Sequence, residues 1–158
     1  MSNKDKYFMQ RAIDLSREGM QSNEGGPFGA VVVKDGKIIA EGKNCVTSSN
    51  DPTAHAEVVA IRNACKKLNS FQLEGCVIYT SCEPCPMCLG AIYWARPERI
   101  IFAASRADAA AIGFDDDFIY KEIPLPVEKR QIPTEQLSRE AGVAVFRLWA
   151  DKEDKMEY

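Results

Sequence analysis

Apolar and polar residues alternate along this chain in two rhythms, one typical of helices and the other of strands. Between residues 4 and 20, apolar side chains recur at helical spacing until Gly25-Gly26-Pro27 interrupts the pattern, which predicts an opening amphipathic helix. Two β-rich runs then flank Asp35-Gly36, a dipeptide suited to the positive φ angles of a tight hairpin turn. The start of the chain therefore predicts one helix followed by a β-hairpin.

Strands and helices continue to alternate further along. The predicted elements are strands near 28–34 and 37–42, a helix within 54–69, a strand at 76–80, a helix at 86–95, a strand at 99–104, a helical stretch at 106–113 and a last helix near 138–150. Asp51 or Thr53 is expected to cap the second helix, and Pro86 suits the first position of the third. An acidic turn is expected at 114–118. Alternation of this kind indicates an α/β layered domain.

Length and composition fit a single globular domain spanning residues 1–158. The chain has 158 residues, of which 46% are hydrophobic and 27% charged. Its amino terminus lacks the apolar stretch of a signal peptide, and no run approaches the length of a membrane span. We therefore expect a cytoplasmic protein with no membrane partner. The charged segment 151–158 is expected to be mobile unless something holds it.

The charge balance argues against a nucleic-acid partner. Twenty Lys and Arg residues against 23 Asp and Glu residues give a formal net charge of -3, and the basic residues are scattered along the chain. A large polyanion usually requires a concentrated basic surface. Nucleic acid is therefore disfavoured, although folding can gather scattered charges into one patch.

Three of the six cysteines, Cys82, Cys85 and Cys88, follow one another at intervals of three residues. Six cysteines could form three disulfides, but a reducing cytosol and a full-length core favour metal binding or free thiols. The only histidine, His55, stands close to Glu57 in a second short motif. A lone histidine is more often structural than a ligand, but thiolate and imidazole together are the ligands that zinc favours. The two motifs therefore predict a zinc site.

Residue spacing constrains this site. His55 and Glu57 are two residues apart, so they converge on one target only in the first turn of a helix. Cys85 and Cys88 share one face at the start of the next helix, where unpaired N–H groups and the helix dipole stabilise thiolates. Adding Cys82 would close the site with four protein ligands, as in structural zinc, whereas three ligands leave a position for water beside a proton-carrying Glu57. The paired motifs H-x-E and P-C-x-x-C are the signature of zinc deaminases and favour the open site.

Three stretches resemble bacterial guanine deaminases of the cytidine-deaminase-like fold: NDPTAHAEVVAIRNAC, YTSCEPCPMCLGAIYWARP and GFDDDFIYKEI. The likeness extends over nearly the whole chain to Tyr158, whereas the zinc motif alone is shared with cytidine and transfer-RNA adenosine deaminases. The resemblance implies a three-layer α/β/α sandwich around a mixed five-stranded sheet, with Zn²⁺ as the cofactor. The implied reaction is hydrolytic, and converts guanine and water to xanthine and ammonia.

The resemblance also implies roles for individual residues. Zinc would be held by His55, Cys85 and Cys88, Glu57 would shuttle protons, the base would be contacted by Asn44, Asp116 and Tyr158, and the wall of the site would include Phe28 and the Ala56 backbone. The residue types agree, because an asparagine amide can donate to guanine O6 or N7 and a carboxylate can accept from a ring N–H. Without the resemblance, Asn44 could simply cap a turn and 115–117 could be a solvated loop.

The carboxy-terminal segment is a separate question. In the resembling family this segment helps to cover an active site and can do so across a dimer, so we expect a homodimer with 151–158 as a lid. A disordered tail is the alternative. Two other functions stay open on the sequence: a transfer-RNA adenosine deaminase, which would need an RNA-binding surface, and a metal-stabilised binding protein with Cys82 as a fourth ligand.

Overall fold

The computed structural model describes residues 2–114 and 116–158, and the chain divides after Asp116 into two compact units. The first unit contains α1 (Asn3–Gln21), β1 (Gly29–Lys34), β2 (Lys37–Lys43), α2 (Val46–Ser49), α3 (Ala56–Leu68), β3 (Cys76–Cys82), α4 (Pro86–Ala95), β4 (Arg99–Ala104) and α5 (Arg106–Ala110). The second unit contains α6 (Asp117–Glu122), the 3-10 helix η1 (Val127–Lys129) and α7 (Arg139–Ala150).

The first unit is built on one mixed sheet with strand order β2-β1-β3-β4. β1 pairs antiparallel with β2 and β3, while β3 and β4 are parallel and are joined by the crossover helix α4. The expected mixed sheet is confirmed, but it has four strands rather than five. Within the described residues, the segments after β4 are helical or irregular, so none of them adds a fifth strand.

The hairpin between β1 and β2 turns at Asp35-Gly36, as the sequence predicts. Both residues have positive φ, 51° for Asp35 and 71° for Gly36. Positive φ at both central positions is the geometry of the two-residue turn that matches the right-handed twist of the strands. The turn therefore fixes the register that pairs Lys34 with Lys37.

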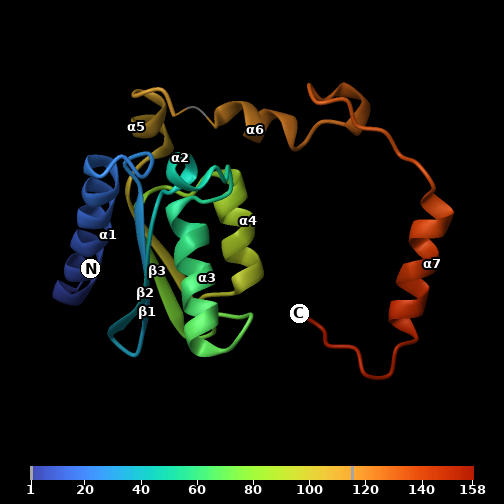
Figure 1. Cartoon of the computed structure of the whole chain (residues 1–158), viewed down its shortest axis with the longest axis horizontal. Helices are drawn as coiled ribbons and strands as arrows, with labels where there is room; N and C mark the ends of the chain where they lie inside the picture. The colour runs from blue at the N-terminus through green and yellow to red at the C-terminus, as the bar shows by residue number, and fades with distance from the viewer. Residues whose placement is uncertain (1, 115) are drawn as a thin grey trace. The chain divides into compact units, whose positions relative to one another are not determined.

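Helices cover both faces of the sheet (Figure 1). On one face, Phe8, Ala12 and Leu15 of α1 form an apolar cluster with Val31 and Tyr79. On the other face, residues of α3 and α4 pack on the inward side chains of β1 and β3 in a second cluster. The α/β/α layers follow from the alternation of each strand, because successive side chains point to opposite faces.

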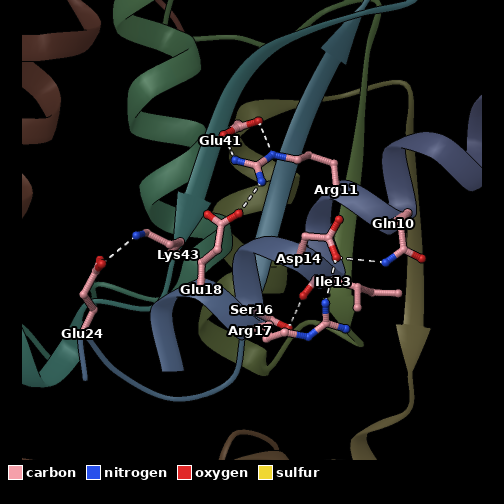
Figure 2. A network of polar contacts seen from close by, with 10 residues as sticks. All are labelled: Gln10, Arg11, Ile13, Asp14, Ser16, Arg17, Glu18, Glu24, Glu41 and Lys43. Carbon is pink, nitrogen blue, oxygen red and sulfur yellow. Dashed lines mark hydrogen bonds and ion pairs between the residues drawn. The ribbon is translucent and has the colours of Figure 1, made fainter. Parts of the chain in front are cut away.

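Charged side chains fasten α1 to β2 on the outside of the molecule (Figure 2). Arg11 donates from Nε and Nη2 to the two carboxylate oxygens of Glu41, both at 2.8 Å, and from Nη1 to Glu18 at 2.6 Å. This bidentate pairing lowers the pKa of Glu41. Lys43 at the end of β2 also pairs with Glu24 at 2.6 Å. The network ties the loop after α1 to the end of β2, where Asn44 follows.

Three local predictions need correction. His55 occupies the N-cap of α3, so the expected cap by Asp51 or Thr53 is wrong. Asp51 instead accepts hydrogen bonds from the Thr53 N–H and hydroxyl at 2.8 and 2.6 Å, which makes a separate local turn. The stretch 43–53, for which the sequence predicts only a polar loop, contains the short helix α2, and α6 begins at Asp117, inside the expected acidic turn. Asp115 lies outside the described residues.

The second unit has no buried residue in any of its helices. In α7, Val145, Phe146, Leu148 and Trp149 are exposed, with Phe146 at 73%. Exposure of an apolar helix face to water is energetically unfavourable, and such a face is typical of a surface that binds another protein surface. Among the helices of the described residues, none has the length and apolar character that crossing a membrane requires.

Candidate active site

The first turn of α3 carries His55 and Glu57. His55 is the N-cap residue, with extended backbone angles (φ -68°, ψ 153°), and Glu57 lies in the first turn of the helix. Only near a helix start can two side chains at this spacing point to the same place. Ala56 between them is fully buried. The position of the helix start therefore brings imidazole and carboxylate together.

The first turn of α4 supplies two thiols in the same way. Cys85 is the N-cap, Pro86 follows at the first helical position, and the Cys88 N–H points to Cys85 Sγ at 3.5 Å. Proline suits this position because its missing N–H would have no partner in the helix. The free N–H groups and the positive end of the helix dipole stabilise negative charge on sulfur.

His55, Cys85 and Cys88 have the geometry of a zinc site. His55 Nδ1 lies 3.5 Å from the Sγ atom of each cysteine, and one donor atom from each residue lies within 4.8 Å of the others. For tetrahedral zinc with Zn–S of about 2.3 Å and Zn–N of about 2.0–2.1 Å, the N···S edge is about 3.6 Å. The donor set therefore fits Zn²⁺, with three protein ligands and a fourth position outside this group.

Cys82 is not a member of this group. It is the last residue of β3, is buried, and its Sγ lies 3.6 Å from the carbonyl oxygen of Ser105. Burial raises the pKa of its thiol to about 11. Its place outside the His55–Cys85–Cys88 group and its contact with Ser105 describe a packed thiol rather than a fourth ligand.

The two ligand thiols differ in acidity. A hydrogen bond from Cys88, with further help from His55, lowers the pKa of Cys85 to about 4, whereas the same bond and burial raise the pKa of Cys88. The interaction with Cys85 likewise raises the pKa of His55. Zinc binding needs both sulfurs as thiolates and the imidazole neutral, so metal affinity falls as the pH decreases.

Glu57 is a buried carboxyl group beside the ligands, with only 6% of its surface exposed. Its Oε1 accepts a hydrogen bond from the Thr80 hydroxyl at 3.1 Å, and its Oε2 lies 3.4 Å from Cys88 Sγ. Burial raises the pKa of this carboxyl group. Sequence reasoning missed Thr80, whose signal is a polar residue at an inward position of a buried strand.

A hydrogen-bonded loop places Asn44 next to the segment that leads into His55. The Asn44 side-chain Oδ1 accepts the N–H groups of Gly26 and Val46, both at 3.2 Å, and its own N–H donates to the Phe28 carbonyl at 3.1 Å. The Cys45 N–H donates to Ala54, immediately before His55, at 2.9 Å. Because Oδ1 is held by two amides, the NH₂ group is turned away from them as a donor.

The other expected substrate residues have different environments. Phe28 packs edge-to-face on Phe114, with ring centroids 4.9 Å apart, and sequence reasoning missed Phe114. The charge of Asp116 is near enough to add to the raised pKa of His55, after the larger effect of Cys85. Tyr158 belongs to the second unit, and its place at the active site stays a prediction.

A sandwich of this topology, with a His-Cys-Cys group at two helix starts that could hold zinc and a buried carboxyl group beside it, is typical of zinc-dependent hydrolytic deaminases. Residues 2–104 match the family described as the cytidine and deoxycytidylate deaminase zinc-binding region, and the chain belongs to this family.

Comparison with individual relatives shows which deaminases within this family the chain resembles. The chain is 60% identical to guanine deaminase from Bacillus subtilis (strain 168) over 151 residues, which cover 96% of this chain and 97% of that protein. The X-ray structure of guanine deaminase from Bacillus subtilis superposes with a TM-score of 0.95 at 57% identity, covering 100% and 99% of the two chains. Guanine deaminase from Nitrosomonas europaea gives a TM-score of 0.68 at 34% identity, covering 73% and 65%. A tRNA-specific adenosine deaminase from Aquifex aeolicus is 43% identical over 99 residues, or 63% of this chain and 65% of that one. The resemblance to bacterial guanine deaminases is therefore confirmed.

Proposed function

We propose that this protein catalyses the zinc-dependent hydrolysis of guanine to xanthine and ammonia. The observation that carries the proposal is the His55, Cys85 and Cys88 group beside the buried Glu57, in a chain that matches a guanine deaminase over 96% of its length. In this reaction the oxygen of water forms a bond to C2 of guanine, and the bond from C2 to the exocyclic nitrogen breaks. The nitrogen leaves as ammonia.

Glu57 is the proton carrier in this proposal. Zinc held by the three ligands would supply a Lewis acid that lowers the pKa of water at its fourth position to about 7. Glu57 Oε2 lies next to that group, so the carboxylate takes a proton from water and passes it to a ring nitrogen. It then takes the remaining proton from the hydroxyl group added at C2 and passes it to the departing amine. Because the exocyclic nitrogen is protonated before its bond to C2 breaks, it leaves as neutral ammonia rather than as an amide anion.

Guanine selection is assigned to polar groups of both kinds. Asn44 donates from its NH₂ group to O6 or N7, because its Oδ1 is already held by backbone amides. Asp116 accepts from a ring N–H, and Phe28 and the Ala56 backbone form the wall. A base without matching groups would leave these buried partners unpaired, which disfavours its binding.

The test of the mechanism is Glu57→Gln, which keeps the side-chain shape but cannot accept a proton. We expect one zinc per chain, an unchanged fold, and a kcat for guanine at least about a thousandfold lower, within the range of general acid–base contributions. Glu98→Gln, at an exposed position, is the matched control and should keep full activity. Substantial ammonia release by the Glu57 variant would refute the proton-carrier role.

Transfer-RNA adenosine deamination is the competing activity, since relatives with this function share the zinc motif. The net charge of -3 gives it little support. Incubation with free guanine and, separately, with transfer RNA, followed by assays for ammonia and inosine, distinguishes the two. Inosine in transfer RNA without ammonia from guanine would overturn the guanine assignment.

We also propose that residues 1–158 work as one domain within a homodimer, with 151–158 as a lid over the partner's active site. The exposed apolar face of α7 supports this, because a second copy could cover it. Light scattering of the full-length protein should give a dimer mass, and a monomer would contradict the proposal.

All six cysteines are free thiols, which supports a cytoplasmic location.

A further inference from the structure

Thr80 is a polar residue in the most protected part of the sheet. It lies on β3, between β1 and β4, where it is paired with Ala30 on one side and Phe102 on the other. Only 1% of its surface is exposed. Alternation along β3 places Thr80 on the same face as the core residues Cys76 and Ile78. At such a position the pattern favours an apolar side chain.

A buried hydroxyl is unfavourable unless it finds a hydrogen-bond partner. The partner of the Thr80 hydroxyl is Glu57 Oε1, at 3.1 Å. The remaining carboxylate oxygen, Oε2, lies 3.4 Å from Cys88 Sγ. The two oxygens of Glu57 therefore have separate surroundings: one is held by the sheet, and the other faces the metal ligands.

The contact joins a stiff side chain to a flexible one. Threonine is branched at Cβ and has few rotamers in a strand, so its hydroxyl occupies a well-defined place. Glutamate has three side-chain torsions, and the last of them is broad. A carboxylate that carries protons must keep one oxygen directed at the reacting atoms. The stiff partner can provide this orientation.

We infer that Thr80 is a positioning residue, whose hydroxyl holds Glu57 Oε1 so that Oε2 stays directed at the His55–Cys85–Cys88 group. This inference rests on the proposed function, in which Glu57 carries the protons. Thr80 itself touches neither substrate nor metal in this role. The relevant variants are therefore Thr80→Val, which keeps the shape and removes the hydroxyl, and Thr80→Ser, which keeps the hydroxyl.

The kinetic test compares these two variants in the full-length, zinc-loaded protein. Thr80→Val should lower kcat for guanine by about tenfold to a hundredfold, the effect of one hydrogen bond to a charged group, with KM within about twofold of wild type and one zinc per chain. Thr80→Ser should recover most of kcat. The inference is overturned if Thr80→Val keeps the wild-type kcat, or if both variants lose activity equally.

Urea unfolding tests the contact without reference to turnover. In the wild-type background, Thr80→Val should lower the urea midpoint, because it leaves the buried carboxyl group short of a donor. In a Glu57→Met background the same change should raise the midpoint, because it removes a hydroxyl with no partner. Equal effects in both backgrounds would overturn the inference. A wild-type protein that releases no ammonia from guanine would instead refute the proposed function, and the urea comparison would still decide the contact.

Discussion

Gly25 lies in the loop between α1 and β1, where the backbone approaches Asn44 too closely for any side chain. A Cβ atom on Gly25 would lie 2.1 Å from Asn44 Oδ1 and 2.5 Å from the Asn44 backbone oxygen, whereas real Cβ contacts stay above 3.0 Å. The backbone oxygen cannot rotate away as the end of a side chain could. Gly25→Ala should therefore displace the loop and the amide that we assign to guanine recognition.

The size of the effect follows from the contacts that would be lost. Displacing Asn44 Oδ1 breaks its hydrogen bonds with the Gly26 and Val46 amides, at about 0.5–1.5 kcal/mol each. Overpacking adds strain of about 1–3 kcal/mol. Together these terms lower the free energy of unfolding by about 2–6 kcal/mol. A misdirected amide should lower kcat/KM for guanine by about tenfold or more, which corresponds to about 1.4 kcal/mol of lost binding.

The assay measures ammonia release against guanine concentration, together with zinc content and urea unfolding. Gly90→Ala is the matched control, because a Cβ at this exposed position in α4 meets no atom within 4 Å. Alanine in a helix interior should stabilise the control by about 0.5–1 kcal/mol and leave kcat/KM unchanged. The reasoning fails if Gly25→Ala keeps wild-type kcat/KM, or if the two glycine variants behave alike.

Four further predictions concern the metal, the tail and the pH. Cys82→Ser should keep one zinc per chain and full activity, and loss of zinc would show that Cys82 is a ligand. Removing zinc from wild-type protein with a chelator should abolish ammonia release and lower the melting temperature, and added Zn²⁺ should restore both; an active metal-free protein would contradict the cofactor assignment. Deleting Lys155–Tyr158 should sharply reduce guanine turnover, and unchanged kinetics would eliminate the lid. Hydrogen bonds from Tyr79 and Ser2 hold the pKa of Asp5 at about 2, below its ordinary 3.8. The ionised form therefore stabilises the fold above pH 3.8, and its contribution is lost as the pH falls toward 2; Asp5→Asn should flatten the decline of the unfolding free energy in this window, measured by urea titration at several pH values.

Sequence patterns were sufficient for the strands and the longer helices of the first unit, but not for the short helix α2. The helix expected at 4–20 spans Asn3–Gln21, because the burial of one helix face leaves a direct trace in the order of residues. The strand expected at 99–104 is β4, which the run of β-prone residues predicts. The cap of α3 failed for a local reason. Asp51 and Thr53 are good capping residues, but they satisfy each other in a turn before the helix begins.

Contacts between segments that are distant along the chain leave no periodic pattern in the sequence, so they could not be predicted from it. Thr80 meets Glu57 across 23 residues of chain, and its role depends on how a strand and a helix are stacked. The orientation of Asn44 depends on the Gly26 amide, 18 residues away. The fifth strand was expected from resemblance alone, and nothing in the periodicity after Ala104 called for it. The grouping of His55, Cys85 and Cys88 could be predicted because metal chemistry constrains both residue type and spacing.

Helices α3 and α4 each begin at a residue of the proposed zinc site, His55 in one and Cys85 in the other. In this proposal the residue at which the helix begins is also the residue that binds the cofactor, so a change in the helix start would also change the metal site. Loss of a single residue just after either helix start would rotate the following turn by about 100° and cost the protein its chemistry while sparing most of its core.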